Sequence, residues 1–201
     1  SANNVLDIAG TKKAAVTTLG GNDSIKIGNS DVTTLDSGAG NDQITVSAAA
    51  KHVITTGTGS DIIAFSGAKT AATSTAAQTV TVKDFTAGSD KLDLRLVQDD
   101  NAATSKLALV DQAKLTAIQT AVDALAADKT LTDALNAAAT LIGTNDGATT
   151  DDPELAFFQF KGDTYVFADQ SDAVAGTYTA GDFVVKLTGT VALTAADFTL
   201  A

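Results

Sequence analysis

The sequence predicts a mainly β fold, in which a right-handed parallel β-roll is followed by a C-terminal β region and carries an inserted α-helical hairpin. Two observations lead to this prediction. A glycine-bearing loop that ends in an aspartate recurs every 19 residues, and each aspartate precedes a short run with strand periodicity. Between residues 107 and 142, the apolar residues instead recur with the period of a helix.

The 19-residue repeat matches at many positions. Asp23, Asp42 and Asp61 each follow a glycine by two residues and precede an isoleucine by two residues. A further apolar column stands earlier in each repeat. The flanking columns are Gly21, Gly40 and Gly59; Ile25, Ile44 and Ile63; and Val16, Leu35 and Ile54. This agreement predicts a coil that stacks on itself, with a column of carboxylates along one side.

Each coil is expected to contain two strands. Period-2 apolar runs follow the aspartates at residues 25–27, 44–46 and 63–65, and a second apolar run falls midway, at 32–35 and 53–54. An earlier end coil is indicated by Asn4 and Leu6, which occupy the Asp23 and Ile25 columns.

A fourth coil is expected within residues 80–94, after an insertion at 67–79 that we expect to be a loop. It repeats the spacing with Gly88, Asp90 and Leu92. The turns on the opposite side, 28–31 and 47–52, lack the glycine–aspartate spacing. We therefore expect metal on one side only, and we expect His52 to be exposed to solvent.

The helical segment is predicted as a hairpin of two helices, about 110–127 and 131–142, with a cap formed by Thr130 and Asp133. Its apolar stripe is expected to pack on the roll rather than to form a partner interface. After a linker at 144–153, strands return at 157–160, 164–167 and 183–187. The predicted domains are a roll at 1–106, a helical insert at 107–143 and a C-terminal β region at 144–201.

Composition excludes several classes of function. The 201 residues include 13 Lys and Arg against 24 Asp and Glu, a net charge of −11 that disfavours nucleic-acid binding. With no Cys and one His, the chain lacks thiolate metal sites and most nucleophile–base pairs, and no H-E-x-x-H motif is present. We therefore expect no enzymatic activity. No apolar run reaches the roughly 18 residues of a membrane span. Since the sequence contains no Met, we expect it to be part of a longer chain.

The spacing G-x-G-x-D-x-U-x, where U is apolar, is typical of calcium-binding parallel β-rolls. Glycine permits positive φ at the tight turn, and aspartate supplies oxygen ligands. Ca²⁺ takes six to eight oxygens, so two stacked loops are needed to hold one ion. Two carboxylates about 5 Å apart repel by roughly 1–3 kcal/mol, depending on the effective dielectric constant. We therefore expect the roll to fold only with Ca²⁺ bound.

These loops resemble the RTX (repeats-in-toxin) family, whose loops share calcium ions between successive coils. The resemblance implies three ions. The first would use Asp23 and Asp42 with the carbonyls of Thr18, Gly20, Gly38 and Gly40; the second would use Asp42 and Asp61 with those of Ser37, Ala39, Gly57 and Gly59; the third would use Asp61 with Asp84 or Asp90. Gly21, Thr56, Thr58 and Gly88 complete the candidate metal residues. The chain departs from the family at Thr18, Ser37 and Thr56, which replace the first glycine, and at Leu19, which replaces the second glycine of the first loop.

Residues 80–94 and 157–201 resemble the C-terminal region of type I secreted RTX proteins, including surface-layer proteins and the non-catalytic end of serralysin proteases. Asp197 and the apolar residues that follow it resemble the uncleaved secretion signal. The resemblance implies a structural, calcium-binding domain of a bacterial surface-layer protein, secreted to the cell surface by a type I apparatus and self-assembling there into a lattice. The alternative is the secretion and folding module of an RTX toxin, adhesin or protease whose active domain lies upstream.

Overall fold

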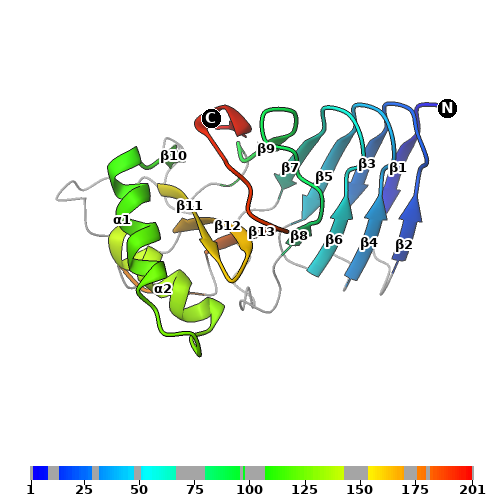
Figure 1. The fold of residues 1–201 in the computed structure, drawn as a ribbon. Helices are drawn as coiled ribbons and strands as arrows, with labels where there is room; N and C mark the ends of the chain where they lie inside the picture. Colours follow the sequence, from blue (N-terminus) through cyan, green and yellow to red (C-terminus); the bar gives the residue numbers. More distant parts are fainter. Residues whose placement is uncertain are drawn as a thin grey trace.

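The computed structural model describes residues 2–8, 14–28, 32–47, 51–66, 80–95, 97, 107–142, 154–169, 176–179 and 182–200. It confirms a mainly β fold with two α-helices among these residues. The strands form two sheets that run side by side along the stack of coils (Figure 1).

The six-stranded sheet contains the strand that follows each aspartate loop. Its order is β1 (Val5–Ile8), β3 (Ser24–Ile27), β5 (Gln43–Ser47), β7 (Ile62–Ser66), β9 (Lys91–Asp93) and β14 (Phe198–Thr199). The eight-stranded sheet contains the midway strands and the C-terminal hairpin. Its order is β10 (Ala108–Leu109), β11 (Glu154–Phe160), β12 (Asp163–Asp169), β13 (Phe183–Leu187), β8 (Val80–Val82), β6 (Lys51–Thr55), β4 (Val32–Asp36) and β2 (Ala14–Thr17).

Strand pairing follows the 19-residue repeat. Ile25 lies opposite Ile44 and Ile44 opposite Ile63, all in parallel strands, while Leu35 lies opposite Ile54 on the other sheet. Alternation along each strand sends the apolar column inward, because successive side chains point to opposite faces. The register of the repeat is therefore the register of the stacked strands.

The expected end coils are also confirmed. Leu6 lies opposite Ile25, so β1 belongs to an earlier coil. Leu92 lies opposite Ile63, so β9 continues the same sheet after the insertion, and Val82 lies opposite Ile54 on the other sheet. The insertion at 67–79 itself lies outside the described residues.

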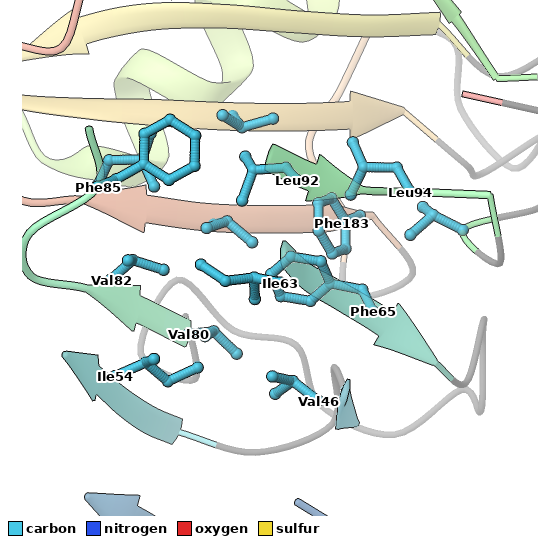
Figure 2. Packing of buried hydrophobic residues seen from close by; sticks show 14 of the residues in the cluster. Val46, Ile54, Ile63, Phe65, Val80, Val82, Phe85, Leu92, Leu94 and Phe183 are labelled. Atoms are coloured by element: carbon cyan, nitrogen blue, oxygen red, sulfur yellow. The ribbon is translucent and has the colours of Figure 1, made fainter. Parts of the chain in front are cut away.

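The C-terminal strands extend both sheets of the coil stack. β13 pairs in parallel with β8, and β14 pairs in parallel with β9. Phe183 of β13 meets Phe65 of β7 edge to face, with ring centroids 5.0 Å apart, in the apolar core shown in Figure 2. Apolar side chains from both regions thus form one continuous core. The division into three domains stays a prediction.

Two helices cover the far end of the eight-stranded sheet (Figure 1). Helix α1 (Gln112–Asp123) is capped by the Asp111 carboxylate, and α2 (Leu131–Ile142) begins with the predicted Thr130–Asp133 cap. Their apolar faces pack against β11, β12 and β13, as expected for an insert that packs within the protein. No helix within the described ranges is long and apolar enough to cross a membrane.

His52 corrects one expectation. It is fully buried, because β6 begins at Lys51 and alternation along that strand turns His52 inward together with Ile54. The last two residues of the predicted turn at 47–52 therefore belong to β6, and its first residue, Ser47, belongs to β5. Burial lowers the pKa of His52, since the charged imidazolium is disfavoured in the core. Residues 48–50, 29–31 and the predicted linker at 144–153 lie outside the described residues.

Candidate metal centre

The loop aspartates form a column along one side of the coil stack. This carboxylate column contains Asp23, Asp42, Asp61 and, in the displaced fourth coil, Asp90, and each side chain is at most 2% exposed. In each of the four carboxylates, Oδ1 accepts the backbone N–H of the column residue one coil earlier. The four distances are 2.7 Å from Asn4, 2.8 Å from Asp23, 2.8 Å from Asp42 and 3.1 Å from Asp61. One half of every carboxylate is thus used to join neighbouring coils.

The second oxygen of these carboxylates, Oδ2, is the unusual part of the site. The Oδ2 atoms of Asp23, Asp42 and Asp61 are buried and have no hydrogen-bond partner. Asp90 differs, because its Oδ2 accepts the Thr86 amide at 2.8 Å. Buried polar atoms without a partner are rare and are a common sign of an ion or water. Three such negative oxygens in one column form a position suited to a cation.

A column of hydroxyl groups, formed by Thr18, Ser37 and Thr56, lies beside the carboxylates. Thr18 donates to the Ser37 carbonyl at 2.7 Å, and Ser37 donates to the Thr56 carbonyl at 2.8 Å. The Thr18 hydroxyl is close enough to Asp23 to lower the pKa of that carboxyl. Its single proton, however, goes to Ser37, so Asp23 Oδ2 keeps no donor.

Asp84 lies outside the carboxylate column. Its Oδ1 accepts the Thr56 amide at 2.9 Å and the Thr56 hydroxyl at 3.3 Å, and its Oδ2 accepts the Gly57 amide at 2.8 Å. The Gly88 amide also has a partner within the protein, since it donates a hydrogen bond to Asp197 at 2.6 Å. Of the two carboxylates predicted to complete a third site with Asp61, the structure therefore brings only Asp90 into the column.

The remaining predicted residues form the loop backbone between the columns. Gly20, Ala39 and Thr58 stack through parallel bridges, and the amides of Gly21 and Gly40 donate to the Ala39 and Thr58 carbonyls, each at 2.8 Å. The coils approach so closely here that a Cβ at Gly57 would overlap the Gly38 carbonyl oxygen. Several predicted carbonyl ligands thus already accept one hydrogen bond, but a carbonyl has a second lone pair.

A column of asparagines on the outer side of the loops was not predicted from the sequence. Asn3, Asn22 and Asn41 each accept, through Oδ1, the backbone N–H of the residue in the next coil, at 2.8–2.9 Å. This direction is opposite to that of the aspartates, which reach back to the earlier coil. The 19-residue spacing of Asn3, Asn22 and Asn41 was a signal that could have revealed this column.

Burial and neighbouring charges alter the acidity of the column. Burial is the main reason that the pKa of Asp61 is raised to about 6, and the charges of Asp90 and Asp42 raise it further against the effect of the Asp42 amide. Burial also raises the pKa of Asp90. At Asp23, burial raises the pKa, but the nearby Thr18 hydroxyl and the hydrogen bonds from Asn4 outweigh burial and hold the pKa below the usual value. Asp61 and Asp90 therefore resist carrying their charges unless a cation is present.

The donor set fits a hard cation such as Ca²⁺. Each coil offers a buried carboxylate oxygen and several loop carbonyls, which are the ligands that Ca²⁺ prefers. Within the described ranges, no three Asp, Glu or His side chains gather into a metal-binding cluster. Backbone oxygens would therefore have to complete the coordination, and the predicted set of ligands stays a prediction.

The fold and this column define a class of repeat protein, in which stacked coils carry loop carboxylates in register. A family model for the Peptidase M10 serralysin C-terminal domain matches residues 1–146. The chain belongs to this family, a non-catalytic, RTX-associated domain of secreted serralysins whose repeats bind calcium. A comparison with curated proteins found no match.

The glycine column gives a matched pair of variants. Gly57 and Gly88 have nearly the same φ, 88° and 82°, but only Gly57 is closely packed, since a Cβ at Gly88 meets open space. We expect Gly88→Ala to lower the free energy of unfolding by about 1–2 kcal/mol through backbone strain. Gly57→Ala should cost about 1–3 kcal/mol more, because the coils must also move apart. Urea unfolding of both variants in Ca²⁺ measures this difference, and equal losses would contradict the close stacking.

Asp61→Asn tests the charge of the column in calcium-free buffer. In the wild type, the Asp61 pKa rises from 3.8 to about 6 on folding, so the folded state retains the proton more strongly. The resulting stability is present below pH 3.8 and is lost as the pH rises through 6. The side-chain amide of the variant keeps an acceptor oxygen for the Asp42 backbone N–H and carries no charge. We expect this variant to match the wild type near pH 4 and to be more stable at pH 7, by roughly 1–3 kcal/mol after solvent screening.

The measurement is urea unfolding of both proteins at several pH values between 4 and 7. His52 acts in the opposite direction, because its lowered pKa removes stability as the pH falls below 6.5. It is common to both proteins, so the difference between them isolates Asp61. A difference that does not change with pH would contradict the raised pKa.

Proposed function

We propose that this chain is a calcium-stabilised RTX-type module, a right-handed parallel β-roll that supports the folding and anchoring of an exported protein. The observation that carries the proposal is the set of three buried carboxylate oxygens without partners, one per coil. Membership of the serralysin C-terminal family supports it, because those domains belong to secreted proteins and bind calcium in such repeats.

Calcium would act as the counter-charge of the column. One ion would be held by Asp23 and Asp42, and another by Asp42 and Asp61, each with loop carbonyls from the two coils. Its positive charge would oppose the effect of burial, which is the main reason that the pKa of Asp61 is raised, and the smaller repulsion from Asp90 and Asp42. Calcium suits these loops better than Mg²⁺, because Mg²⁺ is smaller and demands a near-ideal octahedron.

Within this function, we favour a surface-layer protein that is exported by a type I apparatus and assembles on the bacterial cell surface. An acidic chain without a recognisable catalytic motif supports this choice. The secretion and folding module of a toxin, adhesin or protease is comparably supported, because the family itself is the C-terminal domain of a protease. In both cases, the low calcium of the cytosol would leave the module less stable than it is outside the cell, and therefore easier to export.

A calcium titration tests the function and separates these two candidates. We expect the far-UV circular dichroism signal of β structure to increase from excess EGTA to millimolar Ca²⁺, without an equal response to Mg²⁺. Growth of large particles in light scattering at the same calcium concentrations would favour the surface layer, and a folded monomer would favour the secretion module. A spectrum that is indifferent to calcium would contradict the proposed function.

Asp42 is the sharpest single test of shared ions, because it would serve both sites. Asp42→Asn keeps an acceptor for the Asp23 amide but removes the charge, whereas Asp42→Ala removes both. We expect both variants to lose more than one ion in isothermal titration calorimetry. Only Asp42→Ala should also lose calcium-free stability, by about 1–3 kcal/mol, since it leaves the buried Asp23 amide without a partner. An unchanged calcium isotherm for either variant would contradict the shared column.

A further inference from the structure

The hydroxyl column occupies positions where the family pattern has glycine. Thr18, Ser37 and Thr56 stand 19 residues apart, so a hydroxyl residue is present in all three aspartate loops of the uninterrupted coils. Ser37 and Thr56 are fully buried, and Thr18, at the first of these loops, is half-buried. A buried hydroxyl is tolerated only with a hydrogen-bond partner, so the contacts of these three residues indicate their role.

Each hydroxyl reaches forward to the next coil. The Thr18 hydroxyl donates to the Ser37 carbonyl and the Ser37 hydroxyl to the Thr56 carbonyl, at 2.7 and 2.8 Å. The backbone amides of Thr18 and Ser37 also donate to the following coil, to the carbonyls of Asp36 and Thr55. Each of these two residues thus links two coils through both its backbone and its side chain, and glycine could supply only the backbone link.

The column ends on a carboxylate rather than on another carbonyl. The amide and hydroxyl of Thr56 both donate to Asp84, which also accepts the Gly57 amide. In the earlier loops, the corresponding amide and hydroxyl of Thr18 and Ser37 donate to backbone carbonyls of the next coil, so Asp84 takes the place of those carbonyls for Thr56. Because both oxygens of Asp84 are used in this way, the hydrogen-bonded chain from Thr18 to Thr56 is closed at its C-terminal end.

We propose that this column, together with Asp84, is a metal-independent clamp that holds the aspartate loops in stacked register before calcium binds. The clamp places the Oδ2 atoms of Asp23, Asp42 and Asp61 in one line without any ion. It lowers the calcium concentration that the module needs for folding. The part of the proposal that concerns calcium rests on the proposed function, whereas the clamp itself does not.

The clamp and a bound cation stabilise the same contact by different means. Removal of the Ser37 hydroxyl leaves the Thr56 carbonyl buried without its donor. A cation between the loops would give that carbonyl a new positive partner, since carbonyl oxygens are good calcium ligands. Loss of a clamp hydroxyl is therefore more damaging without calcium than with it. A hydroxyl that only fills space would have the same effect in both conditions.

Two substitutions test the clamp in the complete chain, with urea unfolding in calcium-free and in calcium-saturated buffer. Thr18→Val keeps the side-chain shape and removes the hydroxyl, and Thr18→Ser keeps the hydroxyl and removes the methyl group. Ser37→Ala removes the central hydroxyl, and Ser24→Ala is the control, because Ser24 is an exposed serine of the same coil stack. The Thr18 pair, at the end of the column, remains informative if Ser37→Ala does not fold.

Without calcium, we expect Ser37→Ala and Thr18→Val each to increase the equilibrium constant of unfolding about tenfold, while Thr18→Ser and Ser24→Ala change it less than about threefold. In saturating Ca²⁺ the effect of the first two should fall to about threefold or less. Equal effects in both buffers, equal effects of Val and Ser at position 18, or a wild type that is wholly unfolded without calcium would each overturn the clamp.

Calorimetry of the wild type separates the two proposals. If the wild type binds no calcium, the proposed function fails. In that case the calcium-free comparison of Thr18→Val with Thr18→Ser still decides whether the hydroxyls hold the loops together.

Discussion

The rest of the structure depends on one constraint, the stacking of equivalent residues of successive coils directly above one another. Parallel pairing at a 19-residue register places each side chain directly above the equivalent side chain of the previous coil, as Ile25, Ile44 and Ile63 show. For apolar residues this is favourable, because the columns merge into one core. For ionisable residues it is unfavourable, because identical charges are brought to about the spacing of neighbouring strands. The loops must therefore solve an electrostatic problem that the strands create.

The two oxygens of each carboxylate have different roles in limiting this repulsion. Oδ1 is satisfied within the protein, since it accepts the amide of the preceding coil, and the same contact fixes the spacing of the column. Oδ2 is left without a donor in Asp23, Asp42 and Asp61. The nearby hydroxyls donate elsewhere: those of Thr18 and Ser37 donate to carbonyls of the next coil, and that of Thr56 donates to Asp84. Hydrogen bonds thus hold the coils together while leaving one negative oxygen per coil for a cation.

Sequence reasoning captured what periodicity controls and missed what side chains do at close range. The spacing of Asp23, Asp42 and Asp61 predicted the strands, their register and the displaced fourth coil, because each follows from a repeated apolar pattern. His52 was misplaced, since it was assigned to a turn, whereas β6 begins at Lys51 and alternation along that strand points His52 inward. The role of Asp84 was not predictable, because its partners Thr56 and Gly57 come almost 30 residues earlier, across the insertion that interrupts the 19-residue spacing.

Leu19 shows that glycine is needed in these loops only where another coil packs against it. Gly38 and Gly57 occupy the same column as Leu19. A Cβ at Gly38 would overlap the Leu19 carbonyl of the loop one coil earlier, and a Cβ at Gly57 would overlap the Gly38 carbonyl. Leu19 adopts the same left-handed region, with φ of 72°, although it carries a side chain, and that side chain is 81% exposed. Its backbone therefore bears a strain of order 1 kcal/mol but no overlap.

Two separate costs act at these positions. The turn imposes a left-handed backbone conformation, which strains any residue other than glycine. The neighbouring coil leaves no space for a β-carbon. Gly38 and Gly57 meet both demands, whereas Leu19, with its exposed side chain, meets only the first.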